Sequence, residues 1–204
     1  MSDKESSDEM CWWKSTLKTC TPQELRQIID TPTVGLCLLA NDSYNKVFDG
    51  IYIGDEIIAM NIPLLKSLSI SHVLNASFGD NITTNGLFNF VNTGQQYYSE
   101  SGIQFMGIEA IDHLSFNLYH YFDISANFIE SAINDSGNVL VHCKEGVSRS
   151  VTLVSAYLMI KKGMTAQQSI RIIRQNREIA PNEGFLRQLA FLNDILFNKS
   201  DNNS

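Results

Sequence analysis

No apolar stretch of this sequence is long enough to cross a lipid bilayer. The longest runs, VGLCLLA and VTLVSAYLMI, reach at most about half of the roughly 20 residues that a spanning helix needs. The N-terminus, MSDKESSDEM, also lacks the positive start and the apolar centre of a signal peptide. We therefore expect a cytoplasmic protein without membrane association, and the nucleus stays open as a second location.

Cysteine and basic residues are scarce as well. The four cysteines, Cys11, Cys20, Cys37 and Cys143, have neither the close pairs of a zinc site nor the density of a disulfide framework. Inside the cell we expect them to be reduced thiols, and we expect no metal or other cofactor. Lysine and arginine number 15 against 22 aspartates and glutamates, a net charge of −7 that argues against binding to nucleic acid.

The length of 204 residues suits one domain with a tail at each end. Acidic residues dominate the first ten positions, and the last seven, NKSDNNS, are almost wholly polar. We predict a flexible acidic segment over residues 1–20, a single folded domain over 21–197 and a polar tail over 198–204. The sequence has no internal repeat, and it leaves the oligomeric state open.

Strand-like and helical patterns alternate along the folded domain. Thr21 with Glu24, and Thr165 with Gln168, form capping boxes that open the helices TPQELRQII and TAQQSIRIIRQNR. The Asp49-Gly50 pair predicts a tight turn between two strands. The other predicted elements, in chain order, are a helix in NIPLLKSLSI, strands in SHVLNAS and GIQFMGIEA, a helix from Leu118 to Ile133, a strand in NVLVHC, and helices in VTLVSAYLMI and from about Phe185. This alternation predicts an α/β fold whose central sheet is covered on both faces.

The stretch from Val139 to Ser150, VLVHCKEGVSRS, is the most informative part of the sequence. Its β-branched start has the composition of a buried strand, and a helical segment follows it. Cys143 opens the turn between the two, with a lysine beside it and Arg149 six positions further on. A structural cysteine usually lies in apolar surroundings, so this polar setting indicates a functional thiol.

The turn has the parts that a phosphate-binding nucleophile needs. A strand that passes directly into a helix leaves backbone N–H groups pointing into the loop, and the helix N-terminus adds partial positive charge, so such a loop binds an oxyanion. In that field, and beside Arg149, we expect Cys143 to ionise and act as the nucleophile. The planar fork of Arg149 suits two phosphate oxygens, and Gly146 lets the backbone approach closely. His142 is predicted to hydrogen-bond to the loop backbone, and the Ser150 hydroxyl to stabilise a departing thiolate.

Two other interpretations exist for this stretch. A strand-to-helix turn with a core cysteine would have to match a histidine, a cysteine, a glycine, an arginine and a hydroxyl residue at fixed spacing by chance, which is rare. A sulfur transferase with a cysteine-headed anion loop is the closer rival, but it does not require the histidine before the cysteine.

The residues from His142 to Ser150 match the HCxxGxxR[ST] signature of cysteine-dependent protein phosphatases. The segments GIYIGD, SHVLNAS, FNLYHYF, AYLM and IIRQNREIAPNEGFLRQL resemble the small atypical dual-specificity phosphatases, most closely the VHR type, over residues 21–196. The resemblance implies a mixed sheet of about five strands flanked by helices, no metal, and hydrolysis of phosphotyrosine and phosphothreonine or phosphoserine through a phospho-cysteine. It also implies phosphoprotein substrates, with MAP kinases among the candidates. The loop residues that it assigns to phosphate and substrate binding are Lys144, Glu145, Gly146, Val147 and Ser148.

This chemistry also needs a general acid, because the leaving oxygen must be protonated as the P–O bond breaks. The resemblance assigns the role to Asp112, which follows a predicted strand in the loop EAIDHLSFN. An ordinary loop carboxylate is the alternative interpretation. Asp123 and Asp135 fall inside and just beyond a predicted helix, where we expect solvated surface charges.

Two further residues are assigned by resemblance alone. Arg177 matches a family arginine that takes a second phosphate, although a charge at a helix C-terminus is an equally good interpretation. Asn182 matches a family residue near the active-site loop, with the N-cap of the last helix as the alternative. Val147 stands where the VHR type has an aromatic residue, so the preference for phosphotyrosine stays open.

Two other functions are compatible with the same loop. A phosphoprotein-binding module without catalysis would normally lack the nucleophile, the arginine or the acid, and all three are present here. A phosphatase of lipid, RNA or glycan substrates uses the same chemistry. Lipid enzymes of this kind tend to have extra lysines around the pocket, and Glu145 argues against that arrangement.

Overall fold

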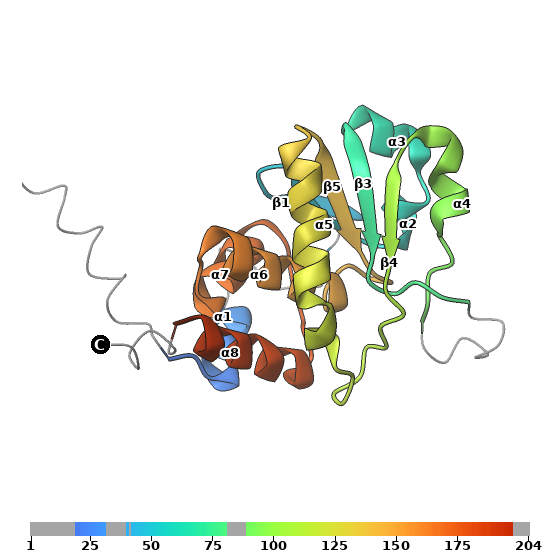
Figure 1. Ribbon diagram of the computed structural model, residues 1–204. Helices are drawn as coiled ribbons and strands as arrows, with labels where there is room; N and C mark the ends of the chain where they lie inside the picture. The colour runs from blue at the N-terminus through green and yellow to red at the C-terminus, as the bar shows by residue number, and fades with distance from the viewer. Residues whose placement is uncertain (1–18, 32–39, 41, 81–88, 198–204) are drawn as a thin grey trace, which may run out of the picture.

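The computed structural model describes residues 19–31, 40, 42–80 and 89–197. The strands in these ranges are β1 (Tyr44–Phe48), β2 (Ile51–Gly54), β3 (Ile70–Asn75), β4 (Gln104–Gly107) and β5 (Asn138–His142). The helices are α1 (Pro22–Asp30), α2 (Glu56–Ala59), α3 (Ile62–Ser67), α4 (Gln95–Tyr98), α5 (Phe122–Asn134), α6 (Arg149–Lys162), α7 (Ala166–Asn176) and α8 (Glu183–Phe197). Two 3₁₀ turns, η2 (Ser99–Ser101) and η3 (Leu118–Tyr121), precede β4 and α5 (Figure 1).

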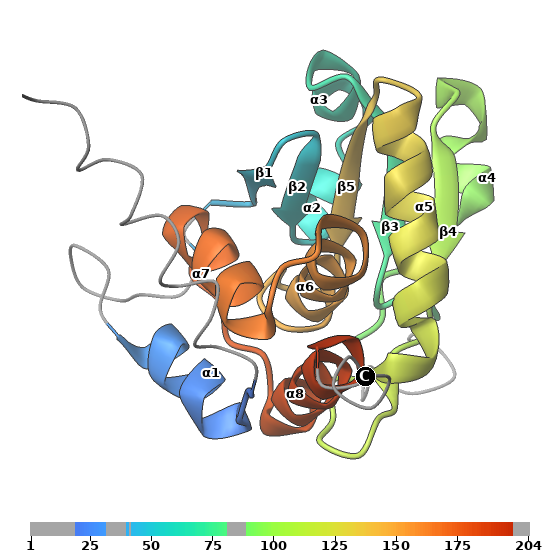
Figure 2. The same cartoon turned by 60° about the vertical axis from the view of Figure 1, so that its left-hand side comes forward.

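The strands form one mixed sheet in the order β1-β2-β5-β3-β4. β1 runs antiparallel to β2, and all other neighbours are parallel. The helices α5, α6 and α7 contact one face of the sheet, and α2, α3 and α4 contact the other, while α1 and α8 pack outside α6 and α7 (Figures 1 and 2). The predicted α/β fold, with a central mixed sheet flanked by helices, is confirmed.

The four parallel strands end at one edge of the sheet. Their register pairs both Gly54 and Asn75 with His142, and Gly107 with Asn75, so the last residues of these strands lie side by side. The connections that leave β2, β3, β4 and β5 therefore begin at the same place. In parallel sheets this carboxyl edge is where ligands bind.

β5 is buried on both faces, in the middle of the sheet. Val139 and Val141 belong to the larger hydrophobic core under α5 to α8, and Leu140 belongs to the smaller core on the side of α2 to α4. Burial on both sides explains why this strand is a continuous apolar run and not an alternating one. α6 is buried from Arg149 to Met159. Packed elements therefore hold both ends of the loop between β5 and α6.

Local signals in the sequence gave the right element starts in several places. Both predicted capping boxes are present, at the starts of α1 and α7. The predicted turn joins β1 to β2, and Gly50 adopts a φ of 71° there, the left-handed conformation that glycine accepts most readily. The described residues contain no helix with both the length and the apolar character needed to cross a membrane.

Two predicted helices have different bounds. The helix expected from Leu118 starts as the 3₁₀ turn η3, and its α-helical part begins at Phe122. The Tyr119 N–H in this turn donates to Oε1 of Gln188 on α8 (2.8 Å), so α8 binds the start of the helical segment. The helix expected in NIPLLKSLSI ends as α3, because Ser69 adopts a positive φ of 55° just before β3 begins.

Candidate active site

The loop of residues 143–148 connects β5 to α6 at the carboxyl edge of the sheet. Gly146 has a φ of 69°, and a Cβ atom at this position would meet the carbonyl group of Gly54 at the end of β2. Both observations require glycine, because any other side chain would strain the backbone and displace the loop from β2. The glycine of the loop motif is thus explained by its close contact with the neighbouring strand.

Cys143 is 1% exposed, and its Sγ lies 3.4 Å from the Ser150 hydroxyl oxygen. Burial by itself raises the pKa of this thiol, but the Arg149 guanidinium, the Ser150 hydroxyl and the backbone N–H groups of Ser150 and Ser148 together lower the pKa below its ordinary value. Cys20 is the contrasting case in the described part of the chain, since burial and the nearby Glu24 raise its pKa to about 12. Of these two buried thiols, only Cys143 lies in a setting that favours the thiolate.

His142 is fully buried at the end of β5. Its Nδ1 lies 3.3 Å from the Cys143 carbonyl oxygen. Burial, together with the charge of Arg149, lowers the pKa of His142 to about 4 even though the carbonyl contact raises it, so the ring is neutral near pH 7. A carbonyl oxygen can only accept, which places the proton on Nδ1. The imidazole therefore donates to the backbone at the start of the loop.

The structure brings Asp112 to the mouth of the same loop. Its Oδ1 accepts hydrogen bonds from the Ser148 hydroxyl (3.0 Å) and from Nδ2 of Asn182 (2.8 Å). Its Oδ2 lies 3.5 Å from Nε of Arg149, and the Asp112 side chain remains 33% exposed. A carboxyl group in this place can reach both the loop and a bound substrate. The same Asn182 also accepts from the Phe185 N–H (3.0 Å), so it caps the start of α8 and contacts Asp112 at once.

Arg149 is 3% exposed and projects from the first turn of α6. Its Nη1 donates to the Ala110 carbonyl oxygen at 2.9 Å. Its buried Nε makes no hydrogen bond within the described part of the chain. The Asp112 carboxylate is its charged neighbour at 3.5 Å, and an anionic ligand oxygen can supply the hydrogen bond that this buried Nε lacks.

α8 supports the segment that carries Asp112. A Cβ at Gly184 would collide with the Leu114 carbonyl group, so only glycine allows the segment to lie this close to the helix. Nε2 of Gln188 donates to the Phe116 carbonyl oxygen at 2.8 Å. Sequence reasoning missed both Gly184 and Gln188. The segment EGFLRQL contained them, but its pattern showed only a helix.

Arg177 lies beneath the loop with 4% exposure, and its guanidinium group donates four hydrogen bonds to protein oxygens. Nε and Nη2 donate to the carbonyl oxygens of Gly146 (2.8 Å) and Glu145 (3.3 Å). Nη1 donates to the Asp42 carbonyl (3.0 Å) and to Oδ1 of Asn45 (2.6 Å). This geometry differs from an open site for a second phosphate, because the donors that would bind the phosphate already join the loop to β1.

The other loop residues point in different directions. Nζ of Lys144 pairs with Oε1 of Glu56 on α2 (2.5 Å), so this lysine turns toward α2. Glu145 is exposed and Val147 is half-buried. The Val147 carbonyl accepts from the Ala180 N–H at 2.8 Å, which links the loop to the segment before α8.

The two other carboxylates considered for the acid lie on α5. Asp123 is in its first turn and Asp135 caps its end, and both are exposed. Within the described ranges, no hydrogen bond or ion pair joins either of them to the loop. The same ranges contain no group of three histidine, cysteine or acidic side chains that could hold a metal ion.

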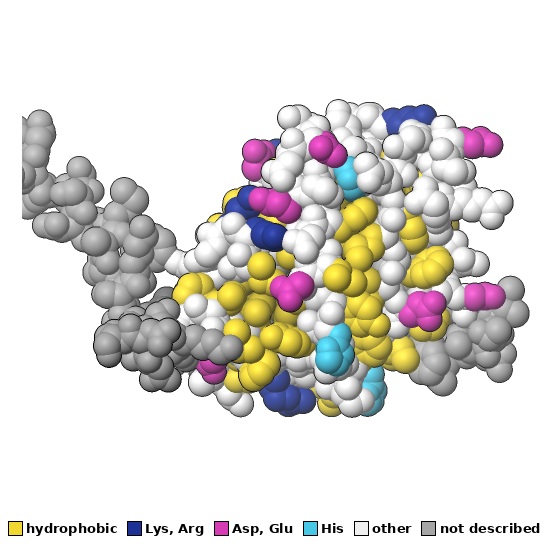
Figure 3. All heavy atoms as spheres, in the orientation of Figure 1, with side chains coloured by type: hydrophobic (Ala, Val, Ile, Leu, Met, Phe, Trp, Pro, Cys, Tyr) yellow, Lys and Arg dark blue, Asp and Glu magenta, His cyan; other side chains and the backbone are white. Residues whose placement is uncertain are grey.

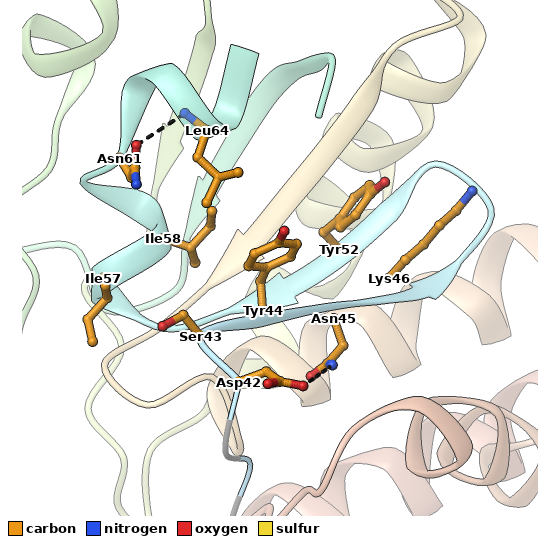
Figure 4. A pocket seen from close by; sticks show the side chains of 10 residues that line it. All are labelled: Asp42, Ser43, Tyr44, Asn45, Lys46, Tyr52, Ile57, Ile58, Asn61 and Leu64. Atoms are coloured by element: carbon orange, nitrogen blue, oxygen red, sulfur yellow. Dashed lines mark hydrogen bonds between the residues drawn. The ribbon is translucent and has the colours of Figure 1, made fainter. Parts of the chain in front are cut away.

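A hollow of about 640 Å³ lies between the β1–β2 hairpin and the helices α2 and α3. Figure 4 shows Tyr44, Lys46 and Tyr52 projecting from one side of the hairpin, whereas Asp42 and Asn45 project from the other. This arrangement follows from the alternation of side chains along a strand. Residues from both sides border the hollow, and on the second side Oδ1 of Asn45 accepts from Nη1 of Arg177.

Comparison with known families agrees with this geometry. The model of the "Dual specificity phosphatase, catalytic domain" family matches residues 51–194, which include the Cys143 loop, Asp112 and Asn182. The chain belongs to the dual-specificity phosphatase family. It is therefore a phosphatase, a hydrolase, and its substrates are phosphoproteins.

Solved structures of dual-specificity phosphatases and related proteins have the same fold. DUSP15 is 26% identical with a TM-score of 0.57, and the match covers 79% of this chain and 98% of that one. Human DUSP28 is 20% identical with a TM-score of 0.66, covering 78% and 97%. The human tyrosine phosphatase-like serine/threonine/tyrosine-interacting protein is 26% identical with a TM-score of 0.62, covering 74% and 96%.

Proposed function

We propose that this dual-specificity phosphatase hydrolyses phosphotyrosine and phosphothreonine or phosphoserine in proteins through a phospho-cysteine. The observation that carries the proposal is the setting of Cys143, a buried thiol with a lowered pKa, 3.4 Å from the Ser150 hydroxyl and close to Arg149. A thiolate held at the bottom of an anion-binding loop is suited to attack the phosphorus atom of a phosphate ester that the loop binds.

In the first step the Cys143 thiolate attacks the phosphorus atom, and the S–P bond forms as the bond to the leaving oxygen breaks. The loop N–H groups and the Nε of Arg149, which makes no hydrogen bond within the described residues, bind the non-bridging oxygens, on which charge accumulates. Asp112 gives its proton to the leaving tyrosyl, threonyl or seryl oxygen.

In the second step water attacks the phospho-cysteine. The Asp112 carboxylate, now without its proton, takes one from the water, and the S–P bond breaks to release inorganic phosphate. The Cys143 sulfur leaves as a thiolate, and the Ser150 hydroxyl at 3.4 Å donates to it. The enzyme returns to its starting state, with Asp112 protonated and Cys143 ionised.

Neighbouring residues support these steps without touching the substrate. The neutral His142 ring donates to the Cys143 carbonyl and so fixes the start of the loop. Arg177 binds two loop carbonyl oxygens, which keeps the opposite, N–H side of those peptides available to phosphate. Asn182 holds Oδ1 of Asp112 beside Ser148.

Proteins fit this site better than multiply charged lipids. PTPMT1, 19% identical with a TM-score of 0.65 over 78% of this chain and 99% of that one, was solved in complex with PI(5)P. In the present chain the cations around the loop are engaged, since Lys144 pairs with Glu56 and Arg177 lies under the loop. Glu145 adds an exposed negative charge. Among protein substrates, we propose the activation loops of MAP kinases as one class to test.

Phosphate release from synthetic phosphotyrosine, phosphothreonine and phosphoserine peptides tests the proposal. We expect wild-type protein to hydrolyse them, and Cys143→Ser to be inactive with an unchanged circular dichroism spectrum, because a serine hydroxyl stays protonated. After rapid acid quench, intact mass should show one added phosphoryl group on wild type and none on Cys143→Ser. Activity of Cys143→Ser within tenfold of wild type would overturn the mechanism.

A further inference from the structure

A second hollow, of about 380 Å³, lies between the segment that carries Asp112 and the outer side of α8. Leu114 and Tyr119 line it from one side, and Gly184, Arg187 and Phe191 line it from α8. We call it the α8 hollow. Apolar side chains gather over α8 and α5 on the face of the molecule seen in Figure 3.

The α8 hollow adjoins the acid of the proposed mechanism. Leu114 follows Asp112 by two residues, and Gly184 follows Asn182 by two. Asn182 and Asp112 are joined by a hydrogen bond of 2.8 Å. Two residues of chain span at most about 7 Å, so the hollow lies within a few residues of a substrate's phosphorylated side chain.

The hollow combines one free positive charge with an apolar wall. Arg187 is exposed and forms no ion pair within the described part of the chain, and no carboxylate lines the hollow. Leu114 and Phe191 are 52% and 56% exposed, high values for large apolar side chains. The Phe191 ring meets Tyr119 edge to face at 5.4 Å between centroids, so the wall is packed in place.

The hollow beside β1 and β2 lacks this combination. Its lysine, Lys46, already pairs with Asp49 at 3.0 Å, and the carboxylate of Asp42 also lines it. Arg177, the arginine expected to take a second anion, is bound to the loop and to β1. Arg149 is occupied by the phosphoryl group in the proposed mechanism, so among the other cations described near the site Arg187 is the one that makes neither an ion pair nor a hydrogen bond and can bind a further group of the substrate.

We infer that the α8 hollow is a specificity subsite for the phosphoprotein substrate, which binds an acidic side chain with an apolar residue next to it, close to the phosphorylated residue. This inference rests on the proposed function. The acidic side chain pairs with Arg187, and its apolar neighbour covers Leu114 and Phe191. An exposed ion pair together with this apolar contact should change kcat/KM by about three- to tenfold.

A matched set of phosphotyrosine peptides tests the subsite. Each peptide carries a Glu-Leu or a Gln-Leu pair at one of the positions near the phosphotyrosine, on either side, in an otherwise fixed Gly/Ser background. For every enzyme, kcat/KM is divided by its value for p-nitrophenyl phosphate, which is too small to reach the hollow. We expect wild type to prefer Glu-Leu over Gln-Leu at one or two adjacent positions by about two- to fivefold, because this pair of peptides changes only the charge.

The control is Arg171→Glu, which makes the same charge change at an exposed arginine on α7. We expect Arg187→Glu to abolish or reverse the preference, Arg187→Lys to keep part of it, and Arg171→Glu to retain it. A Glu-Ser peptide in the same background measures the apolar contact, and Phe191→Ser should weaken the preference for Glu-Leu over Glu-Ser.

Failure of the subsite can be told apart from failure of the proposed function. If wild type hydrolyses p-nitrophenyl phosphate but no phosphopeptide, the proposed protein substrates are wrong. If phosphopeptides are hydrolysed and Arg187→Glu behaves as Arg171→Glu does, or wild type has no preference for glutamate, the subsite is wrong. A preference for a second phosphoserine without one for glutamate would also overturn it.

Discussion

Nε of Arg177 donates a hydrogen bond to the Gly146 carbonyl oxygen at 2.8 Å, across 31 positions of the sequence. The same guanidinium group binds the Glu145 carbonyl and two oxygens at the start of β1. Burial lowers the pKa of Arg177, yet an arginine keeps its charge at any pH at which the protein is folded. The cation therefore fixes the orientation of two peptide groups in the phosphate loop.

Arg177→Lys should lower kcat/KM for p-nitrophenyl phosphate by about ten- to a hundredfold. One ammonium group cannot replace a guanidinium group that binds four oxygens, so the loop should shift. Small displacements of catalytic groups lower the reaction rate strongly. Binding of inorganic phosphate, measured by competitive inhibition, should weaken as well. Arg171→Lys on α7 is the control. If Arg177→Lys binds phosphate as tightly as wild type does, Arg177 has no role in positioning the loop.

Ser150→Ala should move the acid limb of the kcat/KM profile to higher pH. The Ser150 hydroxyl is one of the groups that lower the pKa of Cys143, so its loss raises that pKa, and the thiolate then forms only at higher pH. The rate of iodoacetate labelling at Cys143, followed by peptide mass spectrometry against pH, reports the same shift directly. Cys20, with a pKa of about 12, should stay unlabelled near neutral pH in both proteins. An unchanged labelling profile would show that the hydroxyl does not act on the thiol.

Asp112→Asn should remove the alkaline limb of the pH profile and lower kcat by about a hundredfold or more for phosphates with poor leaving groups. Substrates whose leaving group is already a good one need little protonation and should be slowed less. The control is Asp123→Asn, a carboxylate on the exposed side of α5. If instead Asp123→Asn or Asp135→Asn removes that limb, the acid has been misassigned while the role of Cys143 stands.

Gly184→Ala should act on Asp112 from a distance. The new methyl group would collide with the Leu114 carbonyl and displace the segment that holds Asp112. We expect a larger loss of kcat with poor leaving groups than with good ones, and a lower melting temperature. The control is Gly163→Ala, where a Cβ would meet nothing within 4 Å although φ is 67°, so stability should fall without any leaving-group effect. If Gly184→Ala loses the same factor in kcat with both kinds of leaving group, Gly184 does not act through Asp112.

The features that the sequence determined by itself are local ones. The apolar run Val139–Val141 reflects a strand buried on both faces, and the loop after it must contain Gly146 because the backbone there takes a positive φ. Capping boxes depend on contacts three residues apart, and they predicted the starts of α1 and α7 correctly. The pattern from His142 to Ser150 identified the enzyme class for the same reason, because the whole motif lies in one strand, one turn and the start of one helix.

The tertiary structure decided which distant residues surround that loop. The sequence could place Asp112 after a strand, but only the packing of its segment on α8 sets it 2.8 Å from Asn182. The sequence leaves two equally good interpretations of Arg177. In the structure its guanidinium group donates to the Gly146 carbonyl oxygen and to Asn45 on β1. The α8 hollow has no local signal at all. It exists because Gly184 lets two segments about 70 residues apart touch, and such a contact depends on the packing of the whole chain.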